Sequence, residues 1–359
     1  MTMESVNKSD IEYIALGASL LGTGGGGDPL VGKLMALSAI EKYGGVELIS
    51  IDELRENEKA ATFCMVGAPT VGVEKIPNFE SLENVYTEYE KYYGYKINAI
   101  VPSEIGGVNS MIPFVIAAMK GIPVVDADGM GRAFPEMQMD TFSIAGIPNT
   151  PSIFADEKGN SFVVTTEELK WTEKISRSLV DTLGGSLMNG VYLLDALELK
   201  RHAVPNTVSL ARELGKVIKN FKNPIAHLVK DFGMHCLFTG KIIDVERKTV
   251  GGFVRGKASL LSLEDSESHG VIEFQNENLI CLINEEVKCT TPDLITLVDN
   301  ETGIPVTTEN LRFGMRCSVI ASKADPRWRT ETGIKTVGPR YFGYDYDYVP
   351  VENLFKDEV

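Results

Sequence analysis

The sequence predicts an α/β domain with a mostly parallel sheet, followed by a β-rich domain that is a sandwich or an open barrel. Helical and strand patterns alternate up to Val125, which is typical of a parallel sheet covered by helices. Short β-branched runs separated by Gly, Asn and Asp follow from about Phe232. A chain of 359 residues also has room for two domains of roughly 150 residues each. We place the domains at 1–165 and 166–359.

The first domain is expected to alternate helices with buried strands. Ser9-Asp10-Ile11-Glu12 has the form of a capping box, so we expect the first helix to begin there. Gly94 is expected to end a tyrosine-rich helix. The apolar spacing predicts the remaining helices at 30–43, 79–93 and 108–119, and strands at 46–51, 62–66, 97–101 and 122–125.

The second domain is expected to begin with a helical connector. A hairpin over 153–164, with its turn at 158–160, closes the first domain, and helices are predicted over 167–182 and 207–221. We expect the aromatic, cationic tail to pack back on the first domain. The predicted strands of the β-rich part are 242–245, 271–274, 279–283, 294–297 and 317–321.

Composition and charge exclude several classes of protein. Apolar residues make up 43% and charged residues 24%, as in soluble globular proteins. The 35 basic and 50 acidic residues give a net charge of −15, which argues against binding to nucleic acid or to an anionic membrane. The start lacks the pattern of a signal peptide, so we expect a cytoplasmic protein. The five cysteines form no C-x-x-C pair and are expected to be free thiols.

A glycine-rich loop follows the first predicted helix, in the segment Gly22-Thr23-Gly24-Gly25-Gly26-Gly27-Asp28-Pro29. Two nucleotide-binding patterns match it as strings, but both require a preceding strand, and Leu34 replaces the Mg-binding hydroxyl of a phosphate loop. We therefore expect no nucleotide cofactor. Glycines let backbone N–H groups approach a ligand, whereas the alternative is a tight helix–helix turn. The candidate substrate-binding residues are Gly24, Gly25, Gly26, Gly27 and Asp28.

Two neighbouring strand ends carry polar side chains. The segment after the strand at 122–125 holds Asp126, Asp128, Arg132 and Glu136, and the preceding strand is followed by Glu104 and Asn109. Ligands gather at the carboxyl ends of such strands, and close carboxylates raise one another's pKa, which suits acid–base chemistry. The alternative is a turn that Asp128 caps. We predict catalytic roles for Glu104, Asp126, Asp128 and Glu136, substrate binding by Asn109 and Arg132, and a pocket between the two domains.

His235 and Arg340 complete the candidate site. Of four histidines, His235 alone begins a β segment close to the domain boundary, where a zinc ligand would be useful. A histidine satisfied within the core is the alternative. Arg340 belongs to the cationic tail and could bind a substrate carboxylate, or it could stack on aromatic rings at a domain interface.

The sequence resembles the S-methyl-thiohydantoin desulfurase-like family, long catalogued as a domain of unknown function. The resemblance covers nearly the whole chain in order. It implies an N-terminal α/β domain and a C-terminal β-rich domain, together with hydrolysis of an S-methylated thiohydantoin ring to hydantoin and methanethiol. It also makes zinc assistance plausible, and family members often resemble partners of hydantoinase and oxoprolinase systems. The segments that carry the resemblance are Gly22–Pro29, Ser103–Asn109, Asp126–Glu136, Phe238–Ile242, Trp328–Thr330 and Tyr344–Pro350.

The chemistry of such a ring suggests how the residues would act. Water must attack the ring carbon that bears the S-methyl group, activated either by a metal or by a carboxylate base. The Gly24–Gly27 backbone could supply donors to ring atoms, as in an oxyanion hole. A different class of function is a non-catalytic subunit or sensor that binds such rings beside a hydantoinase-type partner. A homo-oligomer is also compatible with the sequence.

Overall fold

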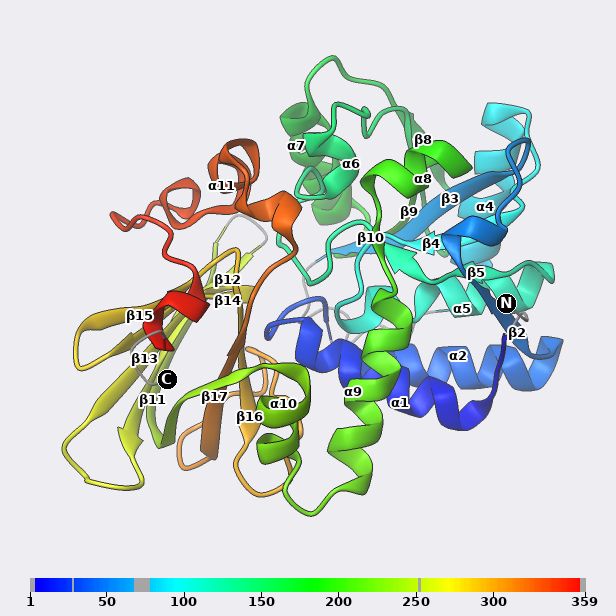
Figure 1. Ribbon diagram of the computed structural model, residues 1–359. Helices are drawn as coiled ribbons and strands as arrows, with labels where there is room; N and C mark the ends of the chain where they lie inside the picture. The colour runs from blue at the N-terminus through cyan, green and yellow to red at the C-terminus, as the bar shows by residue number, and fades with distance from the viewer. Residues whose placement is uncertain (1–3, 28, 68–77, 251–252, 356–359) are drawn as a thin grey trace.

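The computed structural model describes residues 4–27, 29–67, 78–250 and 253–355, and it forms two bodies side by side (Figure 1). One is an α/β layer with a mixed, partly parallel sheet of eight strands, and the other is an antiparallel sheet of seven strands. The predicted fold class is confirmed.

The first sheet has a parallel centre and antiparallel margins. Its central strands pair in parallel in the order β2-β5-β4-β3, as the alternation of helices and strands predicts. The sheet becomes mixed because β1 pairs antiparallel with β2 at one edge, and β9 and the β7–β8 hairpin extend the other edge antiparallel. The full order is β1 (Glu4–Val6), β2 (Val46–Ile49), β5 (Val124–Val125), β4 (Ala99–Pro102), β3 (Lys59–Gly67), β9 (Ser186–Asp195), β7 (Ser152–Ala155) and β8 (Ser161–Val164).

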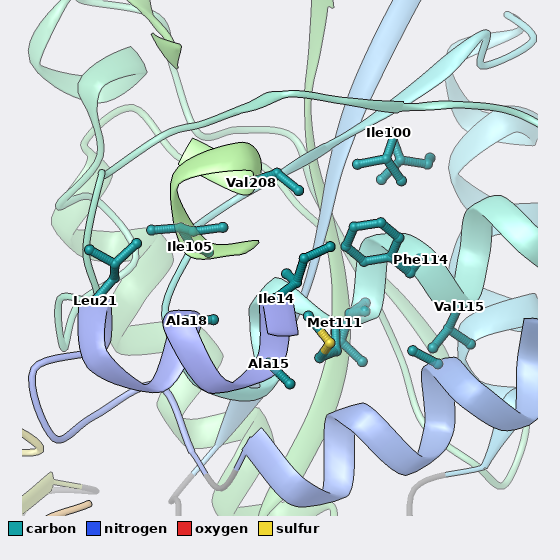
Figure 2. Packing of buried hydrophobic residues seen from close by; sticks show 14 of the residues in the cluster. Ile14, Ala15, Ala18, Leu21, Ile100, Ile105, Met111, Phe114, Val115 and Val208 are labelled. Carbon is teal, nitrogen blue, oxygen red and sulfur yellow. The ribbon is translucent and has the colours of Figure 1, made fainter. Parts of the chain in front are cut away.

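Helices pack closely beside this sheet. α1 (Lys8–Leu21) lies against α9 (Thr207–Asn220), and a Cβ on Gly17 would stand 1.8 Å from the carbonyl oxygen of Ala211, so the contact requires glycine. Figure 2 shows Ile14 and Ala18 of α1 in the apolar cluster with Val208 and Met111. The remaining helices of this layer are α2 (Pro29–Tyr43), α4 (Phe79–Tyr93), α5 (Ile112–Lys120), α6 (Thr141–Ile144), α7 (Leu169–Thr182), α8 (Ala196–His202) and α10 (Pro224–Phe232).

The start of α1 differs from its prediction. The capping box is formed by Asn7 and Asp10 and not by Ser9, because the Asn7 side chain accepts the N–H groups of Ser9 and Asp10. The Asp10 carboxylate in turn accepts the N–H of Asn7 at 3.0 Å. The end of α4 at Gly94 is confirmed, since this glycine adopts the left-handed conformation.

The second sheet is open, with β15 and β16 at its edges, and every pairing in it is antiparallel. The predicted strands fall within five of its strands, and β12 and β15 are additional. The order is β15 (Glu286–Thr290), β14 (Glu277–Ile283), β13 (His269–Gln275), β12 (Phe253–Ser262), β11 (His235–Val250), β17 (Arg316–Ser322) and β16 (Leu294–Asp299).

The tail after β17 returns to the first body. Trp328 is fully buried, donates its Nε1–H to the carbonyl oxygen of Met130 at 2.7 Å, and meets the Phe134 ring edge-on at 4.9 Å. This contact ties the tail to the loop that follows β6 (Ala127–Asp128). Within the described ranges no helix combines the length and apolar character needed to cross a bilayer. The tail elements are the 3-10 turns 326–329, 339–342 and 351–355, and α11 (Glu331–Val337).

Candidate active site

A pocket lies where the two bodies meet. The ends of β3 and β4, the glycine-rich loop and the segment 130–137 form one side, and the β13–β14 turn contributes the other. The empty space inside it, counted together with the opening to solvent, is about 790 Å³. The polar side chains that line it are Cys64, Ser103, Glu104, Asn109, Glu136, Asp140, Asn149, Arg177, Asn189, Tyr192, Asn276 and Glu277.

Glu104 stands just after the end of β4 and is 7% exposed. Its Oε1 accepts a hydrogen bond from Asn109 Nδ2 at 2.7 Å, and its Oε2 has no partner among the described residues. Burial raises the pKa of Glu104 to about 8, the nearby Asp128 carboxyl adds to the shift, and the Asn109 amide and the Phe134 N–H oppose it. A carboxyl with a free oxygen and such a pKa can exchange a proton near neutral pH.

Asn109 fixes the direction of that carboxyl. It lies in the 3-10 turn 107–110, and its Oδ1 accepts the N–H of Met65 at 2.8 Å while its Nδ2 also faces the Met65 carbonyl oxygen at 3.2 Å. Asn109 therefore ties the Glu104 side chain to the end of β3.

Glu277 reaches the same pocket from the second body. It is the first residue of β14, is 2% exposed, and has an Oε2 without a partner in the described chain. Burial raises its pKa well above the ordinary value, the Glu104 carboxyl raises it further, and the Arg132 guanidinium opposes both. Glu104 and Glu277 are thus two buried carboxyls in one pocket, and the charge of Glu104 helps to keep the proton on Glu277.

The glycine-rich loop makes room for Glu277. A Cβ on Gly25 would lie 2.0 Å from Glu277 Oε1, so only glycine lets this carboxyl approach the loop. Gly26 and Gly27 line the pocket, whereas Gly24 lies behind it and its carbonyl oxygen accepts the N–H of Thr308 at 2.9 Å. Gly24 and Gly25 thus serve the contact between the two bodies.

A third buried carboxyl, that of Asp140, also lines the pocket. Its Oδ2 accepts the Tyr192 hydroxyl at 2.7 Å, and its Oδ1 accepts the N–H of Ser143 at 2.7 Å. Tyr192 is the extra residue of a bulge in β9 and has a φ of 51°. Such a bulge redirects a side chain, and the Tyr192 hydroxyl is hydrogen-bonded to Asp140. Burial raises the pKa of Asp140 to about 6, against the pull of these donors.

Glu136 lines the pocket but is already engaged. Its Oε2 accepts the Tyr341 hydroxyl at 2.7 Å and the Gln138 amide at 2.5 Å. Cys64 also lines the pocket, and burial raises the pKa of its thiol to about 12, which keeps it protonated.

Asp126 and Asp128 do not line the pocket, and the structure gives them other partners. The Asp126 carboxylate accepts the N–H and the hydroxyl of Ser209 in the first turn of α9. The Asp128 carboxylate accepts the N–H groups of Ile105, Met130 and Gly131. Both aspartates act as caps because strand-end backbone leaves N–H groups that a short carboxylate can reach.

Arg132 joins the bodies and is not among the residues that line the pocket. It is fully buried, and its guanidinium donates to the carbonyl oxygens of Pro292 and Asp293 and to the Thr23 hydroxyl. Its donors are therefore committed to the domain contact. The positive charge of Arg132 nevertheless acts on Glu277, because it lowers the pKa of that carboxyl against the effect of burial.

The other predicted site residues lie away from the pocket or outside the described chain. Arg340 is exposed and pairs with Asp345 and Asp347, both at 2.8 Å. His235 begins β11 opposite Ala321 and is not a lining residue. Asp28 lies outside the described residues.

The side chains of the described segments do not fit a zinc centre. No group of three or more His, Cys, Asp and Glu residues in those segments is arranged to hold a metal ion. The role of His235 as a zinc ligand stays a sequence prediction.

Several lining residues carried no signal in the sequence. Glu277, Asn149, Asp140 and Tyr192 are distant in the chain and follow no motif spacing. One hint for Glu277 is the polar run 275–278, which interrupts two apolar strands.

Comparison with known families identifies the family of this chain. The model of the S-Me-THD-like N-terminal domain matches residues 9–166, and that of the S-Me-THD-like C-terminal domain matches residues 167–351. The chain belongs to the S-Me-THD-like family. Since the pocket takes residues from both matched parts, both domains of this family contribute to the candidate site.

Structural comparison agrees with the fold. A crystal structure of a protein from Chromobacterium violaceum superposes with a TM-score of 0.83 at 23% identity, covering 97% of this chain and 100% of that one. At this identity the likeness concerns the fold alone. No curated protein matches the sequence.

Proposed function

We propose that the protein hydrolyses an S-methylated thiohydantoin, or a closely related cyclic amidine ring, in the pocket between its two domains. Membership in the S-Me-THD-like family supports the class of ring. The observation that carries the proposal is the pair Glu104 and Glu277, two buried carboxyls from different domains that line one pocket, each with an oxygen that lacks a partner within the described chain.

The reaction consumes one water molecule. Water oxygen bonds to the ring carbon C2, which carries the S-methyl group, and one of its protons passes to a base. The ring nitrogen N1, whose double bond to C2 opens, takes a proton from an acid. The hydroxyl on C2 then gives its proton to the acid as C2 becomes a carbonyl, the C2–S bond breaks, and the sulfur takes the proton held by the base and leaves as methanethiol, so that the acid and the base regain their starting protonation states. The products are hydantoin and methanethiol.

Glu104 suits the role of base. Its pKa of about 8 leaves a reactive carboxylate fraction near neutral pH, and Asn109 holds one oxygen while the other, buried at the pocket, has no hydrogen-bond partner among the described residues. Glu277 suits the role of acid, because its pKa lies well above the ordinary value and it keeps its proton. Gly26 and Gly27 border the same pocket, and we assign their N–H groups to the water-derived oxygen on C2, which becomes the carbonyl of the product.

The family resemblance also suggested zinc. Since the described side chains do not fit a zinc site, the mechanism proposed here routes no step through a metal. Metal content of the purified protein remains a useful measurement beside activity.

The experiment is turnover of S-methyl-thiohydantoin with detection of the released thiol. Glu104→Gln and Glu277→Gln should each lower kcat by about 10²- to 10⁴-fold, the range for loss of a general acid or base. Glu136→Gln is the matched control, because its carboxylate is already engaged by Tyr341 and Gln138, and a much smaller loss is expected.

Two outcomes would overturn the proposal. Ring binding without thiol release by the unaltered protein would indicate a non-catalytic binding subunit, of the kind that could serve a hydantoinase-type partner. Absence of both binding and turnover would remove the ring from consideration.

A further inference from the structure

Asn149 is the lining residue whose side chain is least accounted for by the fold. It lies between α6 and β7, is 1% exposed, and borders the pocket. Neither its Nδ2 nor its Oδ1 has a hydrogen-bond partner among the described residues. Its main chain is anchored, since its carbonyl oxygen accepts the Ser152 hydroxyl at 2.7 Å.

Other amides of the same pocket are engaged. Asn109 bonds to Met65 and Glu104, and Asn189 donates to the carbonyl oxygen of Ile153 at 3.1 Å. A buried amide with neither atom paired costs free energy, so such groups in native proteins have a partner that a bound molecule or water supplies. Asn149 therefore keeps a donor and an acceptor, side by side, for a molecule bound in the pocket that it borders.

A cyclic lactam is the natural complement of that pair. In a five-membered ring the amide is locked cis, so its N–H and C=O point to the same side. A primary amide can then form two N–H···O bonds with it, one in each direction. In the proposed substrate this edge consists of N3–H and the carbonyl at C4, next to the reacting carbon.

Resting on the proposed function, we infer that Asn149 recognises the lactam edge of the ring and thereby determines specificity. Pairing with Asn149 requires the proton on N3, so the side chain selects the tautomer with the double bond between N1 and C2. That orientation turns N1 and C2 toward the rest of the pocket, where Glu104 and Glu277 lie. The substrate class is thus narrowed to cyclic amidines that retain an unsubstituted cis lactam.

The first arm of the test uses the unaltered protein. An S-methyl-thiohydantoin methylated at N3 lacks the donor and adds bulk at the same edge. Its kcat/KM should fall by about 100-fold or more relative to the parent ring, by analogy with sites that lose a buried hydrogen-bond pair.

The second arm uses Asn149→Leu, which keeps the volume and removes both polar atoms. We expect KM for the parent ring to rise about 10- to 100-fold with a smaller change in kcat. The ratio of kcat/KM for the parent ring to kcat/KM for the N3-methyl ring should fall toward the value that the size of the methyl group alone produces. The melting temperature should stay the same or rise, because removal of an unpaired buried polar group is neutral or stabilising.

Asn189→Leu is the matched control, since this asparagine lines the same pocket with equal burial but donates to a carbonyl. It should lower the melting temperature because it removes the buried hydrogen bond to the Ile153 oxygen. If Asn149→Leu also lowers the melting temperature and leaves the discrimination against the N3-methyl ring intact, Asn149 is a structural residue and the inference is wrong. That result leaves the proposed function standing, whereas a protein that neither binds nor turns over the parent ring contradicts the proposed function itself.

Discussion

Glu104 and Asp128 are two buried carboxyls at neighbouring strand ends, and they serve opposite purposes. Burial raises the pKa of both, to about 8 for Glu104 and about 7 for Asp128. Asp128 accepts N–H groups from three residues, whereas Glu104 accepts the Asn109 amide on Oε1 and a weaker contribution from the Phe134 N–H, and its Oε2 has no close partner among the described residues. A buried carboxyl with every oxygen engaged holds the fold, and one with a free oxygen in a pocket is available for chemistry.

The two regions are also connected. Asp128 accepts the N–H of Ile105 at 2.8 Å, and Ile105 follows Glu104 in the chain. Asp128 therefore positions the backbone that carries the candidate base, although it does not line the pocket.

The largest effect on stability is expected for Asp128→Ala. The substitution leaves the N–H groups of Ile105, Met130 and Gly131 unpaired in the interior, at about 1–3 kcal/mol each when nothing replaces the partner. We expect the free energy of unfolding in urea to fall by about 3–5 kcal/mol. A loss below about 1 kcal/mol would mean that Asp128 is not a structural cap and would break the comparison.

The next effect concerns pH and Glu104. A base with a pKa of about 8 makes kcat/KM rise with pH up to about that value, and Glu104→Gln should remove this limb from the profile. Thermal stability provides the second readout. A carboxyl whose pKa is raised in the folded state stabilises the fold fully at pH values below its ordinary pKa of 4.5. This stabilisation is lost as the pH rises through about 8.

Glu104→Gln should therefore flatten the decline in melting temperature between pH 5 and pH 9. Asp140, with a pKa of about 6, and Asp128, with a pKa of about 7, also titrate in this range, whereas the Cys64 thiol, with a pKa of about 12, does not. Subtracting the profile of the variant from that of the unaltered protein isolates Glu104. Identical profiles would show that another group sets the limb.

The smallest effect is expected for Asp126→Ala. Asn206, the residue at the N-cap position of α9, makes no side-chain cap bond, and Asp126 accepts the N–H of Ser209 at 2.9 Å in its place. Loss of such a cap costs about 1 kcal/mol, without a comparable loss of kcat. Arg340→Ala is the control, because its surface ion pairs should change stability by less than about 0.5 kcal/mol. A large loss of activity in Asp126→Ala would instead support the catalytic role that the sequence predicts for Asp126.

Local patterns predicted much of the α/β layer. The helix over 79–93 and its end at Gly94 coincide with the structure, and the hairpin with its turn at 158–160 is present. The capping box of α1 was misplaced, since Asn7 competes with Ser9 for the same role. β9 was missed although it pairs with β3 over nine registered positions, because long-range pairing leaves little local signature.

The sequence by itself determined the two-domain fold class and brought Glu104, Asn109, Glu136, Gly26 and Gly27 into consideration, because strand ends and glycine loops have local signatures. Only the tertiary structure separated Glu104 from Asp128, since both are carboxylic acids at strand ends and they differ in the donors that reach them. It also decided the role of Glu277. The polar run 275–278 has the form of an exposed turn, yet all four residues are buried because the glycine-rich loop packs over them, with Thr23 accepting the N–H of Asn278. Contacts between segments some 250 positions apart follow from packing and closure of the two domains, and no spacing along the chain encodes them.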